Sequence, residues 1–236
     1  MIDATAIPTA AVHWNQARRI IRSIYPPADL FEDIADPADW PLLISAEQKT
    51  NPRLMDTIGN LDLVPPDRRV GGTGASYLMA PFTHVSPDRP SRFGAGAFGV
   101  LYAGESFETA LAETIHHHER FMRRTREPEG WTSQFRELVL DVSLTAHDLT
   151  DSGVYVEALD PDDYGEAQRV GAILKANGSD GILYPSVRNV GGRCVGLFYP
   201  DLAALPTQGR HLDYHWNGDR VDFYREPASG TVFEVQ

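Results

Sequence analysis

Short apolar runs bounded by turn residues predict the strands of a sheet. The runs FGVLYA (98–103), GILYPS (181–186) and CVGLFY (194–199) are almost wholly apolar, which is typical of buried strands. In FRELVLDVSL (135–144) apolar and polar residues alternate, and this period of two predicts a strand with one buried face. We therefore expect several strands that share one sheet.

Two segments show the period of an α-helix instead. Residues 107–122 carry apolar and aromatic positions at helical spacing, and Ser106 before them is a favourable N-cap. The stripe consists of Phe107, Ala110, Leu111, Ile115 (or Thr114), His118, Phe121 and Met122. The segment YGEAQRVGAILKANG (164–178) is amphipathic and ends at Asn177-Gly178, which is a typical helix stop. We expect both helices to cover the sheet.

The two ends of the chain have different patterns. The segment from Ala17 to Leu61 mixes short helical patterns with proline-containing turns, and residues 64–76 are the most linker-like segment. We expect residues 1–70 to be an ordered extension packed on a main domain at 71–236. Asn217-Gly218 lies between two alternating runs and predicts a C-terminal β-hairpin, and TVFEVQ (231–236) adds a last strand. The expected fold class is α/β or α+β, with a mixed central sheet flanked by helices.

Composition narrows the classes of protein. The 236 residues include 21 Lys and Arg against 33 Asp and Glu, a net charge of −12 that disfavours direct nucleic acid binding. No apolar run approaches the length of a membrane span, and the first residues lack the basic start and apolar stretch of a secretory signal. We expect a cytoplasmic protein without a membrane partner.

The segment GAGAFG (94–99) has the spacing G-x-G-x-x-G, which suggests a dinucleotide-binding turn. That turn must follow a strand and open a helix, so that the pyrophosphate lies at the helix N-terminus. Here a proline-bearing loop precedes the glycines and a predicted strand follows them. Glu113 imitates the usual ribose-binding acid by spacing, but it falls within a predicted helix. We therefore reject this motif and expect a flexible loop that leads into a strand.

Two other features offer little chemistry by themselves. The run His116-His117-His118 lacks a metal-ligand spacing, and consecutive helical residues point about 100° apart, so we expect no metal. The single cysteine, Cys194, excludes an internal disulfide and falls in a predicted strand, where we expect a buried, unreactive thiol.

The segment SRFGAGAFGVLYAGESFETALAETIHHHERF (91–121) resembles the RES domain family, toxins of bacterial toxin–antitoxin modules. The pattern is an Arg before a glycine-containing loop, a Tyr at the end of the next strand, a Glu in the next helix and, much later, a Ser after Pro. In this sequence these positions are Arg92, Tyr102, Glu113 and Ser186. Many members carry G-G-R-W-N around the Arg, whereas this chain has PSRFG (90–94), so the Arg transfers more safely than its neighbours.

The resemblance, which covers about residues 70–200, implies a function. Members are similar in fold to ADP-ribosyltransferases and degrade NAD+ by cleaving the bond between nicotinamide and ribose. NAD+ would then be a substrate and no cofactor is expected. The implied partner is an antitoxin with a Xre-type helix-turn-helix domain, which would supply the DNA binding that an acidic toxin lacks.

Each of the four matching residues has a functional and an ordinary interpretation. An ionised Glu113 would stabilise the positive charge that develops on the ribose, or it would pair with His116 or His117 on a helix surface. Arg92 would bind the pyrophosphate, or it would be a solvated loop residue. Tyr102 would stack on nicotinamide, or pack in the core with a hydrogen-bonded hydroxyl.

Ser186 would bind the nicotinamide carboxamide or a ribose hydroxyl, and its ordinary role would be to cap a turn. We do not expect it to be a nucleophile, because no G-x-S-x-G elbow surrounds it. Weaker candidates for substrate binding are Arg19 for a phosphate, His84 near the cleft, and Arg188.

Three functions remain open from the sequence. The first is a toxin that releases nicotinamide from NAD+, with water or phosphate as acceptor. The second is ADP-ribosylation of a protein, which the similar fold suggests. The third is a non-enzymatic binding module that acts through its partner, which the acidic composition suggests.

Overall fold

The structure, a computed structural model, describes residues 1–32, 36–51 and 53–235, and these contain eight strands and six α-helices. The strands are β1 (Thr9–Arg22), β2 (Leu101–Gly104), β3 (Trp131–Asp148), β4 (Gly181–Pro185), β5 (Arg193–Leu197), β6 (Thr207–Trp216), β7 (Val221–Glu226) and β8 (Thr231–Glu234). The helices are α1 (Asp29–Glu32), α2 (Trp40–Glu47), α3 (Leu54–Ile58), α4 (Ala75–Thr83), α5 (Phe107–Met122) and α6 (Gly165–Ala176). No helix in these ranges is long and apolar enough to cross a membrane.

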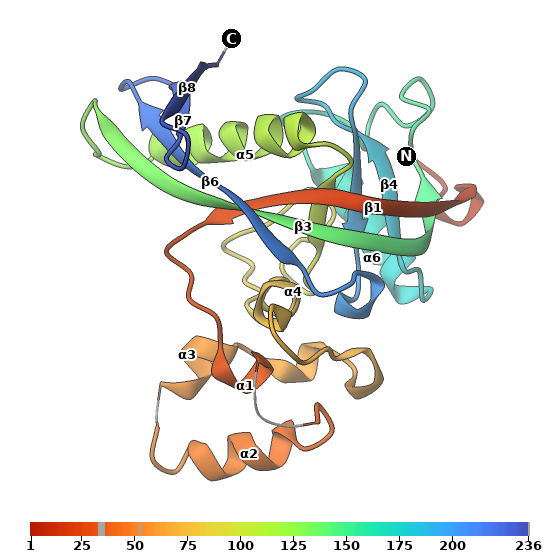
Figure 1. The fold of residues 1–236 in the computed structure, drawn as a ribbon. Coiled ribbons are helices and arrows are strands. Elements are labelled where there is room, and N and C mark those ends of the chain that lie inside the picture. The colour runs from red at the N-terminus through yellow and green to blue at the C-terminus, as the bar shows by residue number, and fades with distance from the viewer. Residues whose placement is uncertain (33–35, 52, 236) are drawn as a thin grey trace.

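The strands form one sheet in the order β1-β2-β5-β4-β3-β6-β7-β8, and β1 also pairs with β3. This extra pairing closes β1, β2, β5, β4 and β3 into a ring. β3 is long enough to serve three partners, because β1 occupies one of its edges while β6 and β4 share the other. The β3–β4 pair is parallel and the other pairs are antiparallel. The mixed sheet flanked by helices confirms the expected fold class (Figure 1).

The N-terminal segment differs from the expectation. The pattern from Ala17 on was interpreted as helical, but residues 9–22 form β1, which pairs with β3 from Thr9–His147 to Arg22–Phe135. Residues 9–22 therefore belong to the main sheet and not to an extension packed on it. The reason is that the alternation of β1 is interrupted: the register shifts between Trp14 and Ala17, and Val12 and Ala17 are buried in one apolar cluster while Ile20 is buried in another. Arg18, Arg19 and Arg22 interrupt the alternation of apolar and polar residues, so the sequence does not show the period of two that is typical of a strand. The rest of the segment is helical, as expected, with residues 33–35 and 52 outside the described ranges.

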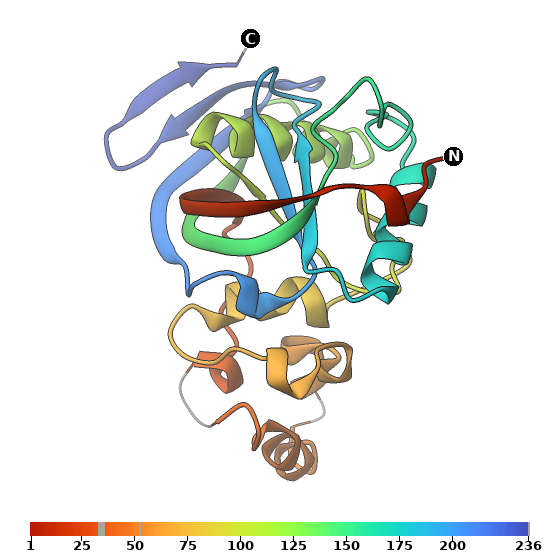
Figure 2. The same cartoon turned by 90° about the vertical axis from the view of Figure 1, so that its right-hand side faces the viewer.

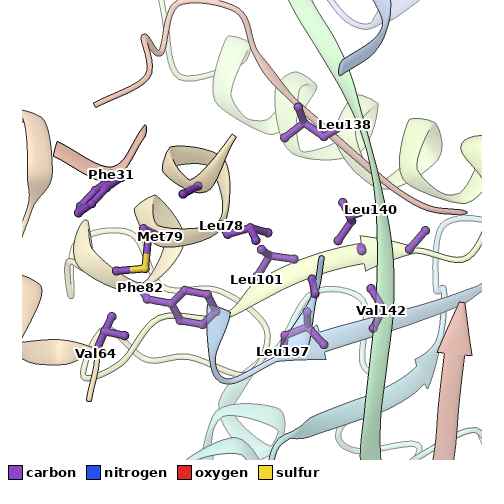
Figure 3. Close-up of a cluster of buried hydrophobic side chains, with 14 of the residues drawn as sticks. Phe31, Val64, Leu78, Met79, Phe82, Leu101, Leu138, Leu140, Val142 and Leu197 are labelled. Atoms are coloured by element: carbon purple, nitrogen blue, oxygen red, sulfur yellow. The ribbon is translucent and has the colours of Figure 1, made fainter. Parts of the chain in front are cut away.

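Three helical layers cover the sheet, each over its own apolar cluster. Helix α4 and the α1–α3 lobe lie beneath the sheet in Figure 1, while α5 lies across the opposite side and α6 packs near the N-terminus (Figures 1 and 2). The largest cluster joins Phe31, Met79 and Phe82 of the lobe and α4 to Leu101 and Leu140 of the sheet (Figure 3). The β6–β7 hairpin packs on α5 through a second cluster, and α6 on β4 and β5 through a third.

Most of the other elements lie where the sequence places them. Helix α5 has the expected bounds, and the hydroxyl of Ser106 accepts a hydrogen bond from the Thr109 amide at 3.2 Å, which is the expected N-cap. Helix α6 ends before Asn177, and Gly178 takes a left-handed φ of 77°. The turn at Asn217-Gly218 joins β6 and β7, and β8 is the expected last strand, with Gln236 outside the described residues.

The glycines of GAGAFG precede a strand and do not open a helix, which confirms that the dinucleotide motif is absent. Their role is close packing. A Cβ added at Gly99 would lie 2.1 Å from the carbonyl oxygen of Pro81 and 2.5 Å from the Cα of Phe82, both backbone atoms of α4. Gly96 has a φ of 97° and lies against the backbone of Pro87. The loop therefore needs glycine in order to reach α4.

Gly99→Ala should lower the free energy of unfolding by about 1–3 kcal/mol, because neither backbone segment can move aside cheaply. Urea unfolding followed by circular dichroism measures the change. Gly153→Ala is the matched control, because Gly153 is a loop glycine with an ordinary φ whose added Cβ would meet its nearest atom at 3.4 Å. If both variants lose the same stability, the close approach at Gly99 has no energetic role.

Candidate active site

A cavity of about 350 Å³ opens between β1, the start of α5 and the loop before β2. It brings together Arg19, Arg92, Tyr102 and Glu113, four of the predicted site residues, from four separate segments. The rest of its wall includes Arg18, Ser91, Thr114, His117, Tyr184 and Cys194. Glu113 is the one carboxylate among the residues that line it, and three arginines accompany it. The cavity is therefore locally positive in a protein of net charge −12.

Glu113 is held in place by the hydroxyl of Ser186. Ser186 Oγ donates a hydrogen bond to Glu113 Oε1 at 2.7 Å, across 73 positions of sequence. The same Oγ accepts from the backbone amides of Arg188 at 3.2 Å and Asn189 at 3.0 Å. These two donors use the lone pairs of the hydroxyl and leave its proton for the carboxylate. The second carboxylate oxygen, Oε2, has no hydrogen-bond partner in the described part of the chain.

Ser186 consequently has a different place from the one expected. Its side chain is 7% exposed and is not part of the cavity wall, so it does not meet a ligand directly in this structure. It caps the turn at 186–189, as its ordinary interpretation proposed, and it orients Glu113. Asn189 ties the same turn to α5, since its Nδ2 donates to Thr109 Oγ1 at 2.9 Å.

Tyr102 forms hydrogen bonds to the loop that carries Arg92. Its hydroxyl lies 2.9 Å from Ser91 Oγ and accepts a hydrogen bond from the amide of Phe93, also at 2.9 Å. Burial raises the pKa of Tyr102 to about 12, and the two hydrogen bonds oppose that rise in part. The phenol therefore stays protonated, and its ring forms part of the cavity wall while its hydroxyl is occupied by the loop.

Arg92 is buried and is not the solvated loop residue of its ordinary interpretation, because it is only 7% exposed. Its Nη1 donates to the carbonyl oxygens of Asp160 at 2.8 Å and Ala158 at 3.3 Å, and its guanidinium lies 4.5 Å from the ring centroid of Tyr164. Among the described residues no carboxylate forms an ion pair with it.

Arg19 is the second guanidinium of the cavity that forms no ion pair with a carboxylate among the described residues. Its Nη1 donates to the carbonyl oxygen of Tyr102 at 3.1 Å, while its Nε is buried and has no protein partner in the described part of the chain. Burial lowers the pKa of Arg19 to about 10, so the guanidinium is still charged at neutral pH. A desolvated charge without a counter-ion is costly unless a ligand supplies the opposite charge.

The family is decided by a further comparison. A model of the RES domain matches residues 66–217, which is well over half of the chain. The chain belongs to the RES domain family. It is also similar to the uncharacterized protein y4oC of Sinorhizobium fredii (strain NBRC 101917 / NGR234), with 28% identity over 207 residues that cover 86% of this chain and 84% of the relative. A structural likeness exists to the crystal structure of the M. tuberculosis MbcT-MbcA toxin-antitoxin complex, with 13% identity, a TM-score of 0.46 and 90% coverage of both chains.

The structure places two of the weaker candidates of this RES domain outside the cavity wall. His84 is exposed at the end of α4, where its Nε2 lies 3.3 Å from the carbonyl oxygen of Asp56, and it does not line the cavity. Arg188 lies outside the cavity wall too, and its Nη2 donates to the carbonyl oxygen of Pro161 at 2.6 Å.

Sequence reasoning missed other residues of the RES domain cavity. His117 lines it, one helical turn after Glu113, and the i to i+4 spacing was the signal that was available. Arg18 lines the cavity as well, and its Nε lies 3.3 Å from Oε1 of the buried Glu137. Cys194 is 2% exposed and lies in β5, which confirms its expected burial in a strand, and burial raises the pKa of its thiol to about 12.

The three consecutive histidines of the RES domain, His116, His117 and His118, have different surroundings. His118 is buried against Phe135 and Tyr214, with ring centroids 5.0 and 6.0 Å away. His117 faces the cavity, and His116 meets its ring at a centroid distance of 5.5 Å. Within residues 1–32, 36–51 and 53–235, no group of three His, Cys, Asp or Glu side chains could hold a metal ion.

Tyr102→Phe should free the loop that carries Arg92, because it removes the acceptor of the Phe93 amide and leaves that amide without a partner. We expect a loss of about 1–3 kcal/mol in the free energy of unfolding and faster hydrogen exchange at the Phe93 amide. Exchange measured by NMR checks this. Tyr25→Phe, at a tyrosine that is 54% exposed, is the control. Unchanged exchange at Phe93 would show that the phenol does not hold the loop.

Proposed function

We propose that this RES domain is a toxin that degrades NAD+ by cleaving the bond between nicotinamide and ribose. One observation carries the proposal. A carboxylate fixed by Ser186 and two guanidinium groups without carboxylate partners in the described residues share one cavity. Charge, size and chemistry of that cavity each fit a different part of NAD+.

The charges fit the pyrophosphate. It carries one negative charge on each phosphate, and Arg19 and Arg92 offer one positive charge each. Arginine presents a planar fork of N–H donors that matches phosphate oxygens, and it keeps its charge when it is buried. A bound pyrophosphate would supply the counter-charge that the buried Nε of Arg19 lacks.

The size fits the other end of the dinucleotide. A cavity of about 350 Å³ lies at the lower end of the range for small-molecule sites. It holds a nicotinamide ribose better than the whole dinucleotide, so the adenosine would lie outside. The aromatic walls at Tyr102 and Tyr184 supply apolar surface for the nicotinamide ring.

Glu113 supplies the chemistry. When the bond between C1′ of the ribose and the ring nitrogen breaks, its electron pair stays on nicotinamide, which leaves as a neutral molecule. Positive charge then develops on the ribose, and an ionised carboxylate nearby stabilises it more than it stabilises the ground state. The hydrogen bond from Ser186 keeps one carboxylate oxygen fixed, which lowers the reorganisation needed during the reaction.

The acceptor for the ADP-ribosyl group can be water, phosphate or a protein side chain, and all three share this first step. Transfer to a protein is the alternative function. A toxin that consumes NAD+ must be neutralised in the cell that makes it, and the family resemblance points to a Xre-type antitoxin. We propose such a partner for this chain.

Glu113→Gln should lower the rate of nicotinamide release from NAD+ by about 1000-fold, because the amide keeps the shape of the side chain but carries no charge. Nicotinamide is quantified by chromatography after incubation of purified protein with NAD+, with and without phosphate. On expression in bacteria, the wild-type chain should arrest growth and this variant should not.

Glu108→Gln is the matched control, because Glu108 is an exposed residue in the first turn of the same helix. It should behave like the wild type. The proposal fails if folded wild-type protein, freed of any bound antitoxin, releases no nicotinamide in either buffer. It fails in its assignment of the site if Glu113→Gln keeps full activity.

Arg19→Met should weaken NAD+ binding about 10- to 100-fold without lowering stability, because it removes a partly buried charge that has no carboxylate partner in the described residues and keeps the apolar stem. Calorimetric titration, carried out in the Glu113→Gln background to prevent turnover, measures the affinity, and urea unfolding without ligand measures the stability. Arg124→Met, at an exposed arginine, is the control. Unchanged affinity would remove Arg19 from the substrate site.

A further inference from the structure

Helix α5 presents a stripe of four residues to the cavity. Ala110, Glu113, Thr114 and His117 all line it, at positions i, i+3, i+4 and i+7. Thr114 turns its hydroxyl away, since Oγ1 donates to the carbonyl oxygen of Ala110 at 2.6 Å. Glu113 and His117 are therefore the two side chains of this stripe that offer polar atoms to a ligand.

The ring of His117 is suited to proton transfer. It is exposed at the cavity, and neither ring nitrogen has a hydrogen-bond partner in the described residues. Partial burial lowers the pKa of His117, and Arg188, Arg120 and Arg92 lower it further, while Glu113 opposes them. A lowered pKa favours the neutral form of the ring, which can accept a proton.

The spacing of the two side chains fits a reacting ribose. Residues one turn apart on a helix have Cβ atoms about 5–6 Å from each other. A ribose whose C1′ lies against Glu113 leaves room for an attacking oxygen beside the next turn of the helix. His117 is open to solvent, so water can reach its nitrogen and a proton can leave it.

We propose that His117 is the general base that activates a hydroxyl acceptor, in the simplest case water, for attack on C1′ of the ribose. This rests on the proposed cleavage of NAD+. As the C1′–N bond breaks and its electron pair stays on nicotinamide, the acceptor oxygen bonds to C1′. The proton of that oxygen passes to the free ring nitrogen of His117 and then to solvent. The products are nicotinamide, ADP-ribose and one proton.

The experiment compares acceptors that do and do not carry a proton. His117→Gln should slow the release of nicotinamide in plain buffer about 100-fold, at the low end of general base catalysis because the ribose is already a strong electrophile. Azide, an anion with no proton to lose, should restore the rate in this variant and yield the azide adduct of ADP-ribose. The wild-type rate should fall at acidic pH along a limb that the variant lacks.

His116→Gln is the matched control, because His116 is the neighbouring histidine and lies outside the cavity wall. It should keep the wild-type rate. A rate for His117→Gln within twofold of wild type overturns the inference, as does a slow variant that azide does not rescue, which would indicate lost packing or binding. If the wild-type protein itself releases no nicotinamide, the proposed function fails, and this inference fails with it.

Discussion

The pairing of β1 with β3 is the interaction on which the rest of the structure depends. It extends along almost the whole of β1 and closes a ring through β2, β5 and β4. Closure brings Arg19 beside Tyr102, whose carbonyl oxygen accepts its hydrogen bond. The same ring places the end of β4 under α5, where Ser186 meets Glu113. The direct pairing of β1 with β2 is a single residue pair, Arg18–Gly104, so the position of Arg19 beside Tyr102 depends on the much longer pairing of β1 with β3.

The site combines two opposite electrostatic arrangements. Its carboxylate is fixed by a hydrogen bond from a neutral hydroxyl, whereas two of its three arginines, Arg19 and Arg92, lack carboxylate partners among the described residues. By contrast, Arg210 pairs with Glu137 and Glu226, away from the cavity. Unpaired buried charge reduces stability, so its presence is best explained by a ligand that carries the opposite charge. The acidic protein thus has a small, locally positive cavity.

Local patterns predicted the elements whose apolar period is plain, such as α5 with its Ser106 cap. They did not predict β1, because its arginines interrupt the alternation of apolar and polar residues. Its partner strand, β3, is also more than 100 residues away in the sequence. The family resemblance singled out Glu113 and Arg92, and both line the cavity. No local pattern in the sequence indicated that Ser186 would hydrogen-bond to Glu113, which lies 73 positions away. His84, expected near the cleft, lies outside the cavity wall.

The most direct test of the account is a crystal structure of the Glu113→Gln variant with NAD+ bound. The account predicts that the nicotinamide ribose lies against residue 113, with its hydroxyls within hydrogen-bond distance of the side chain, and that the pyrophosphate lies on Arg19 and Arg92. Nicotinamide should lie between the aromatic walls, still bonded to the ribose. A cavity that stays empty at saturating NAD+, or a dinucleotide bound elsewhere on the protein, would contradict it.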